Sequence, residues 1–110
     1  MSVEIQFVSE SDSLSSRAHQ DLCSHLKTEG VEAEVSGQDG KMDFAAIITI
    51  VLASPFVAII AKGIVDRIMK FGLYEVEFTF GDKKVTVKNV RKKSAVELIK
   101  EIKDVLTQNE

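Results

Sequence analysis

Residues 43–70 decide the fold, and they read DFAAIITIVLASPFVAIIAKGIVDRIMK. From Phe44 to Ala61 there are 18 residues without a charge, and only Thr49 and Ser54 among them are polar. A continuous helix of this length would be roughly 27 Å long, close to the ~30 Å hydrocarbon core of a bilayer. The stretch is therefore either the core of a globular domain or a segment that enters a membrane.

Ser54-Pro55, in the middle of this stretch, favours the globular interpretation. Serine is a good N-cap and proline fits the first helical position, whereas proline inside one long helix would cost about 3 kcal/mol. We expect one helix near residues 43–53 and a second near 55–71. The first would be apolar all round, and the second would carry a charged side with Lys62, Asp66 and Lys70.

Composition indicates one globular domain over residues 1–110. Apolar residues make up 45% of the chain and charged residues 28%, with a formal net charge of −3. This mild charge argues against nucleic acid as the partner. Cys23 is the only cysteine, so the fold cannot depend on an internal disulfide. The first residues lack the pattern of a signal peptide, and we expect a cytoplasmic protein, membrane-associated if residues 44–61 insert.

Alternating apolar residues predict strands before and after the central stretch. Residues 3–7 and 31–35 alternate and flank a helix over about 14–28, which suggests a parallel pair with a crossover. Residues 74–80 alternate as well, and Gly81-Asp82 then supplies a two-residue hairpin turn that places Phe78 opposite Val85 and Val76 opposite Val87. Ser94 and Glu97 form a capping box that opens a final amphipathic helix.

The predicted order of elements is β-α-β-α-α-β-β-α. The fold class that follows is α+β, with two layers: a four-stranded mixed sheet and helices mostly on one face.

The residues that could carry catalysis or bind a metal form no convincing group. His19 and Cys23 share one helix face, but His25 points elsewhere, and no further Cys or His could complete a zinc site. No nucleophile elbow or phosphate-binding loop is present. We therefore expect no enzyme, no metal and no cofactor.

Two sets of residues are candidates for protein contact. The first is the apolar stretch itself, which needs cover on more than one side and would associate through Phe44, Ile47, Ile50 and Val51. The second is the basic run around the hairpin, which includes Lys84, Lys88, Arg91, Lys92 and Lys93. No aromatic residue is interleaved with that run, which weakens the case for single-stranded nucleic acid.

The segments IVLASPFVAIIAKGIVDRIMK and YEVEFTFGDKKVTVKNV resemble the small bacterial domains called effector-associated constant component, type 1. The resemblance covers most of the chain, but Phe71 and Gly72 stand where arginine-rich segments are common in that family. It implies a non-enzymatic component of bacterial conflict or defence systems, and it assigns no functional residue.

Two functions follow as expectations. The first is an interaction or assembly component that binds an effector protein or a second copy of itself. The alternative is a small membrane-acting protein that inserts residues 44–61 and keeps Lys62, Arg67 and Lys70 at the headgroups.

Overall fold

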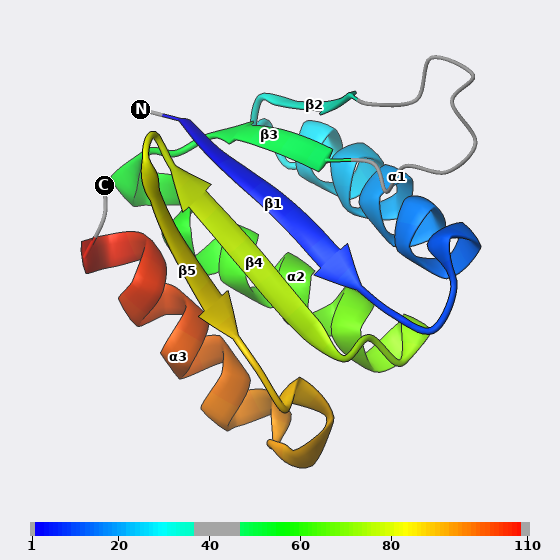
Figure 1. Ribbon diagram of the computed structural model, residues 1–110. Helices are drawn as coiled ribbons and strands as arrows, with labels where there is room; N and C mark the ends of the chain where they lie inside the picture. The colour runs from blue at the N-terminus through cyan, green and yellow to red at the C-terminus, as the bar shows by residue number, and fades with distance from the viewer. Residues whose placement is uncertain (1, 37–46, 109–110) are drawn as a thin grey trace.

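The computed structural model describes residues 2–36 and 47–108, which form an α+β fold with a sheet on one side and helices on the other (Figure 1). In this part of the chain the elements are β1 (Ser2–Val8), α1 (Asp12–Thr28), β2 (Ala33–Ser36), β3 (Ile47–Val51), η1 (Ser54–Phe56), α2 (Val57–Phe71), β4 (Glu75–Phe80), β5 (Lys83–Val87), η2 (Val90–Lys92) and α3 (Ala95–Gln108). All three helices lie on the same face of the sheet (Figure 1).

The sheet has five antiparallel strands in the order β2-β3-β1-β4-β5. The predicted four-stranded mixed sheet is therefore wrong, and the order of elements is β-α-β-β-α-β-β-α. The predicted strands at 3–7 and 31–35 do run in the same direction, but β3 lies between them and pairs with both. Up to β4 this is the split βαβ arrangement of ferredoxin-like folds, and β5 and α3 extend it at one edge.

The predicted helix at 43–53 is wrong, because residues 47–51 form β3. Ile48 and Ile50 are fully buried toward the helices, while Thr49 and Val51 point to the other face. The segment is short and rich in β-branched residues, which pack well on a pleated sheet. An apolar run this short fits a strand or a helix, and the β-branched residues decide it. Residues 43–46 lie outside the described residues.

The break at Ser54-Pro55 is confirmed, although its details differ from the prediction. Ala53 occupies the cap position, Ser54 and Pro55 begin the 3-10 turn η1, and α2 follows from Val57. The buried face of α2 includes Ile60, Ile64 and Ile68. This part of the long apolar stretch is thus an amphipathic helix, as expected.

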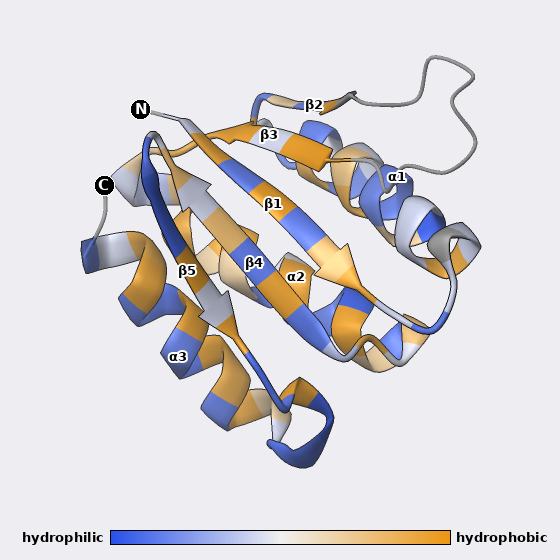
Figure 2. Cartoon of the chain, viewed as in Figure 1, coloured by the Kyte–Doolittle hydropathy of each residue, from blue (hydrophilic) through white to orange (hydrophobic). Residues whose placement is uncertain are grey.

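The hairpin and the last helix match the prediction. In the β4–β5 pair Phe78 lies opposite Val85 and Val76 opposite Val87. Figure 2 shows the alternation of apolar and polar residues along β1 and β4, whose apolar side chains point toward the helices. The Glu97 N–H donates to Ser94 Oγ at 3.2 Å, and the Ser94 N–H donates to Glu97 Oε1 at 3.4 Å, which completes the capping box.

Helices α1 and α2 approach closely at Gly63. A Cβ built on this glycine would lie 3.1 Å from Cδ1 of Leu22 and 3.4 Å from Cδ2 of His25. The distance to Leu22 is shorter than ordinary van der Waals contact and the distance to His25 is at its lower limit, so the lack of a side chain at Gly63 allows the two helices to pack this closely.

His19 is the one fully buried titratable side chain in the described core. Its Nε2 accepts a hydrogen bond of 3.0 Å from the Phe7 N–H of β1, and its ring lies 5.0 Å from the Phe7 ring. Nδ1 has no partner of good geometry among the described residues, although the backbone of Ser15 is near enough to raise the pKa slightly. Burial outweighs that effect and lowers the pKa of His19 to about 4.

This buried imidazole predicts acid sensitivity. The imidazole of His19 takes up a proton near pH 6.5 in the unfolded chain but only near pH 4 in the folded chain. The contribution of His19 to the free energy of unfolding is therefore fully present above pH 6.5. It should be lost as the pH falls to 4, lowering the free energy of unfolding by about 3 kcal/mol. Urea titrations between these pH values should show a steep loss for the wild type and a shallower one for His19→Gln, whose amide oxygen can still accept from Phe7. Equal slopes would contradict the assignment.

Candidate functional site

The predicted basic run does not form one cluster in the structure. Lys84, on β5, lies 3.4 Å from a carboxylate oxygen of Glu77 on the neighbouring strand. Lys93 donates to Glu101 of α3 at 2.6 Å. The other three cations of the run, Lys88, Arg91 and Lys92, line a groove of about 430 Å³ at the open end of the hairpin, opposite the Gly81-Asp82 turn. Tyr74, Glu75 and Asn89 also line it. We call this hollow the basic groove.

The backbone between β5 and α3 builds the basic groove. Asn89 adopts the left-handed conformation, with φ 57° and ψ 35°, which asparagine tolerates better than most residues. The chain then turns through η2, where Val90 is fully buried and its N–H donates to the Tyr74 carbonyl at 3.3 Å. With Val90 anchored, Arg91 and Lys92 are both exposed.

Tyr74 holds the Arg91 guanidinium in place. The guanidinium carbon lies 4.9 Å from the centre of the Tyr74 ring, within the range of a cation–π contact. The Tyr74 hydroxyl donates a short hydrogen bond to the carboxylate of Glu10. That hydrogen bond raises the pKa of Tyr74, so the phenol keeps its proton and continues to donate. The arginine is thus oriented before any ligand arrives.

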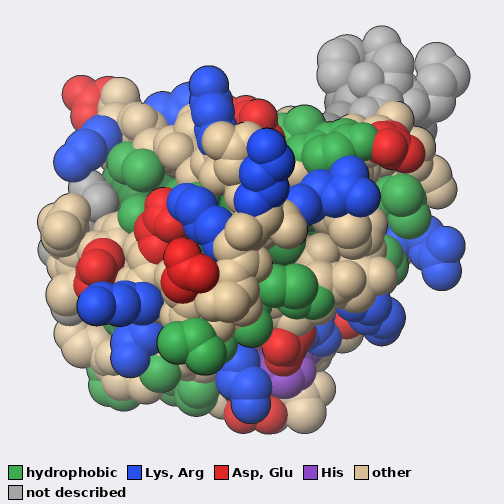
Figure 3. Space-filling view, turned by 90° about the horizontal axis from the view of Figure 1, so that it is seen from below, with side chains coloured by type: hydrophobic (Ala, Val, Ile, Leu, Met, Phe, Trp, Pro, Cys, Tyr) green, Lys and Arg blue, Asp and Glu red, His purple; other side chains and the backbone are tan. Residues whose placement is uncertain are grey.

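Cations and carboxylates alternate around this end of the molecule. Figure 3 views it from the end at which η2 lies in Figure 1, and Lys and Arg side chains are interspersed with Asp and Glu. The apolar side chains on this face form small separate groups. The surface suits a partner of mixed polarity better than a uniform polyanion.

The predicted apolar contact residues are not brought together in one place. Phe44 lies outside the described residues. Ile50 is fully buried in the core. Ile47 is half-buried and Val51 is 41% exposed, and both point to the face of the sheet away from the helices.

The membrane alternative rested on an apolar helix that is absent from the described residues. Within residues 2–36 and 47–108, none of the helices is both long and apolar enough to span a bilayer.

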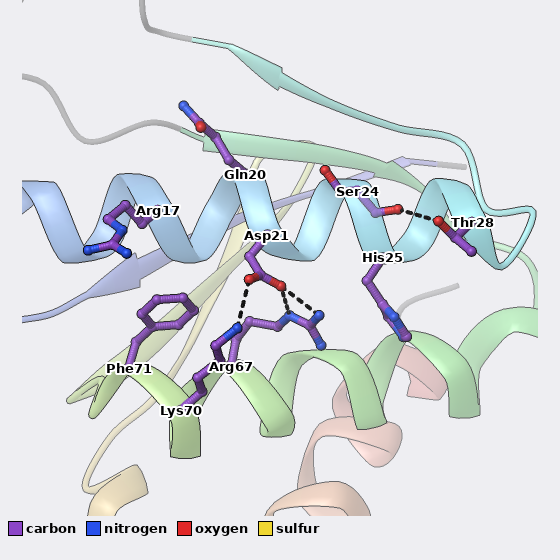
Figure 4. A pocket seen from close by; sticks show the side chains of 9 residues that line it. All are labelled: Arg17, Gln20, Asp21, Ser24, His25, Thr28, Arg67, Lys70 and Phe71. Carbon is purple, nitrogen blue, oxygen red and sulfur yellow. Dashed lines mark hydrogen bonds and ion pairs between the residues drawn. The ribbon is translucent and has the colours of Figure 1, made fainter.

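A second hollow, of about 590 Å³, lies between α1 and α2 and was not predicted (Figure 4). Asp21 of α1 points across it, where Oδ1 accepts from Arg67 Nε at 3.0 Å and from Nη2 at 2.7 Å. Its other oxygen accepts from Lys70 Nζ at 3.0 Å. Burial would raise the pKa of Asp21, but the hydrogen bonds and charges of Arg67 and Lys70 outweigh it and lower the pKa.

This arrangement joins two helices, because Arg67 and Lys70 of α2 share the one carboxylate of Asp21 on α1. Arg17 of α1 is a third cation that lines the hollow. Sequence alone could identify Asp21 and Arg67 as charged residues beside apolar stripes, but their pairing depends on how α1 crosses α2.

The histidines and the cysteine take structural positions. His19 and Cys23 are buried, and His25 is half-buried beside the α1–α2 hollow. Across the described part of the chain, no three His, Cys, Asp or Glu side chains are placed to hold a metal ion together.

Comparison of the chain with protein-family models gave no match, and comparison with curated proteins gave none either. The resemblance to effector-associated constant components therefore stays a prediction.

The Asp21 contact generates a stability prediction. Asp21→Asn should lower the free energy of unfolding by about 1–2 kcal/mol, because the Arg67 side chain, only 12% exposed, loses its ionic partner. Lys70→Met is the control. Its side chain is 62% exposed, so the cost should stay within about 0.5 kcal/mol. Chemical denaturation measures both, and equal costs would show that the pairing with Arg67 contributes no stability.

Proposed function

We propose that this chain is a non-catalytic interaction component that binds an effector protein of a bacterial conflict system in the cytoplasm. The resemblance of residues 50–70 and 74–90 to effector-associated domains supports the class of partner. The basic groove supports the mode of contact, in which it receives an acidic segment of the partner. The observation that carries the proposal is the pre-oriented Arg91 on Tyr74, in a groove that two further cations, Lys88 and Lys92, also line.

The cations of the basic groove are available for a partner. No ion pair joins Lys88, Arg91 or Lys92 to a carboxylate among the described residues, whereas Lys84 and Lys93 are each paired. A guanidinium held by an aromatic ring loses less side-chain entropy on binding a carboxylate than a free one does. The groove is therefore suited to one or two acidic side chains.

The carboxylates around the groove favour a protein partner over nucleic acid. Glu75 lines the groove, and the carboxylate of Glu10 accepts a hydrogen bond from the Tyr74 hydroxyl, so consecutive phosphates would meet repulsion. The only aromatic ring at the site already carries Arg91 and is not free for base stacking. A peptide can place its acidic residues against Arg91 and Lys92 and avoid both glutamates.

Fluorescence anisotropy with a labelled peptide that carries two Asp or Glu residues among neutral ones tests the proposal. Arg91→Glu and Lys92→Glu should each weaken binding about tenfold, because each replaces an attraction by a repulsion. Lys103→Glu is the matched control, since it changes the charge by the same amount at an exposed position of α3 that does not line the groove. It should change binding less than about twofold.

Two results would overturn the proposal. If Lys103→Glu weakens binding as much as Arg91→Glu, the peptide responds to net charge and no groove is involved. If a single-stranded oligonucleotide of the same length binds more tightly than the peptide, the partner is a nucleic acid.

A further inference from the structure

The hollow between α1 and α2 has an excess of positive charge. The cations that line it are Arg17, Arg67 and Lys70, and Asp21 is the only carboxylate among its described lining residues. One carboxylate offsets one of these three charges, so two positive charges remain. The helices run in opposite directions, and Figure 4 shows Arg17 at the same end of the hollow as Lys70 and Phe71.

Arg67 is held at the hollow with part of its hydrogen-bonding capacity unused. Nε and Nη2 both donate to Asp21 Oδ1, and Nη1 donates to the Gly63 carbonyl at 3.3 Å. A guanidinium has two N–H groups on each Nη, so one on Nη1 and one on Nη2 remain for a ligand. The side chain is only 12% exposed, and a cation that is already held in place loses little entropy when it binds.

Lys70 and Arg17 supply further donors. Lys70 Nζ donates to Asp21 Oδ2, and an ammonium group has N–H groups left after one such bond. Nζ also lies 5.3 Å from the centre of the Phe71 ring, which holds the ammonium at the wall of the hollow. Arg17 is exposed and pairs with no carboxylate in the described part of the chain. All three cations therefore have unused N–H groups around one space.

We propose that this hollow binds a small phosphate monoester, either a sugar phosphate or a nucleoside monophosphate. A phosphate monoester carries a charge of about −1.5 to −2 at pH 7, which matches the two uncompensated charges better than a single carboxylate does. Its oxygens accept the paired hydrogen bonds that a guanidinium donates. The hollow, of about 590 Å³, lies within the range of small-molecule sites and has room for more than the phosphate group alone.

The uncharged lining residues suit the rest of such a ligand. Gln20, Ser24 and Thr28 place polar groups along α1, and Phe71 adds an aromatic wall. Hydroxyl groups of a sugar can bond with the first three, and a flat ring can pack against the last. This inference does not depend on the proposed function, because the residues that line this hollow and those that line the basic groove are different.

NMR titration of isotope-labelled protein with ribose 5-phosphate, with AMP and with adenosine tests the inference. At least one of the two phosphate esters should bind with a Kd of about 1 mM or below and shift the amide signals of α1 and of the end of α2. Adenosine should not bind, because it lacks the phosphate. The ester that binds more tightly identifies the body of the ligand as a sugar or a nucleoside.

Variants locate the phosphate within the hollow. Arg17→Gln and Lys70→Met should each weaken binding of the ester about fivefold to tenfold, because each removes a charge-assisted hydrogen bond. Lys27→Gln is the matched control, since it neutralises an exposed cation of α1 that does not line the hollow, and it should change binding less than about twofold. All three positions are exposed, so circular dichroism should show the wild-type fold.

Four outcomes contradict the inference. The first is the absence of binding by both esters up to about 10 mM. The second is a loss with Lys27→Gln as large as the loss with Arg17→Gln, which would indicate a response to net charge. The third is a set of shifted signals around the basic groove in place of α1 and α2. The fourth is adenosine binding as tight as that of AMP, which would show that the phosphate is not recognised.

Discussion

One continuous apolar segment supplies the inner strand β3 and the helix that crosses behind the sheet, and the rest of the structure depends on how this segment is divided. Ile48 and Ile50 enter the core from the sheet, and Ile60, Ile64 and Ile68 enter it from the helix layer. The turn at Ser54-Pro55 lets both halves bury their side chains in the same interior. Helices α1 and α3 pack on either side of α2, so their positions follow from this division.

Sequence patterns predicted the local elements well where periodicity and turn chemistry agreed. The Gly81-Asp82 turn, with Phe78 opposite Val85, follows from alternation on both strands together with a glycine that adopts φ 66°. The capping box at Ser94 is equally local. The pattern at 47–51 predicts a helix wrongly because two of the outward positions of the strand, Ile47 and Val51, are apolar. The segment therefore lacks the alternation of apolar and polar residues that identifies a strand with one face in water.

Long-range placement is what sequence could not supply. Nothing local shows that β3 lies between β1 and β2, since this depends on competition among pairings across the whole chain. The candidate site shows the same limit. The basic run is visible in the sequence. The sequence does not show that Lys84 and Lys93 pair with carboxylates while Lys88, Arg91 and Lys92 line the groove. The stacking of Arg91 on Tyr74 joins residues from two sides of the hairpin. The pairing of Asp21 with Arg67 likewise requires the crossing of α1 and α2.

The absent side chain at Gly63 has a consequence for how this sequence can vary. Leu22 Cδ1 occupies the space that a Cβ at this position would enter, so the two residues share one small volume between α1 and α2. A larger residue at 63 needs a smaller one at 22, and a smaller residue at 22 alone leaves a cavity. Although the two positions are far apart in the chain, they should vary together. Homologous sequences with a larger residue at position 63 should carry a smaller one at position 22.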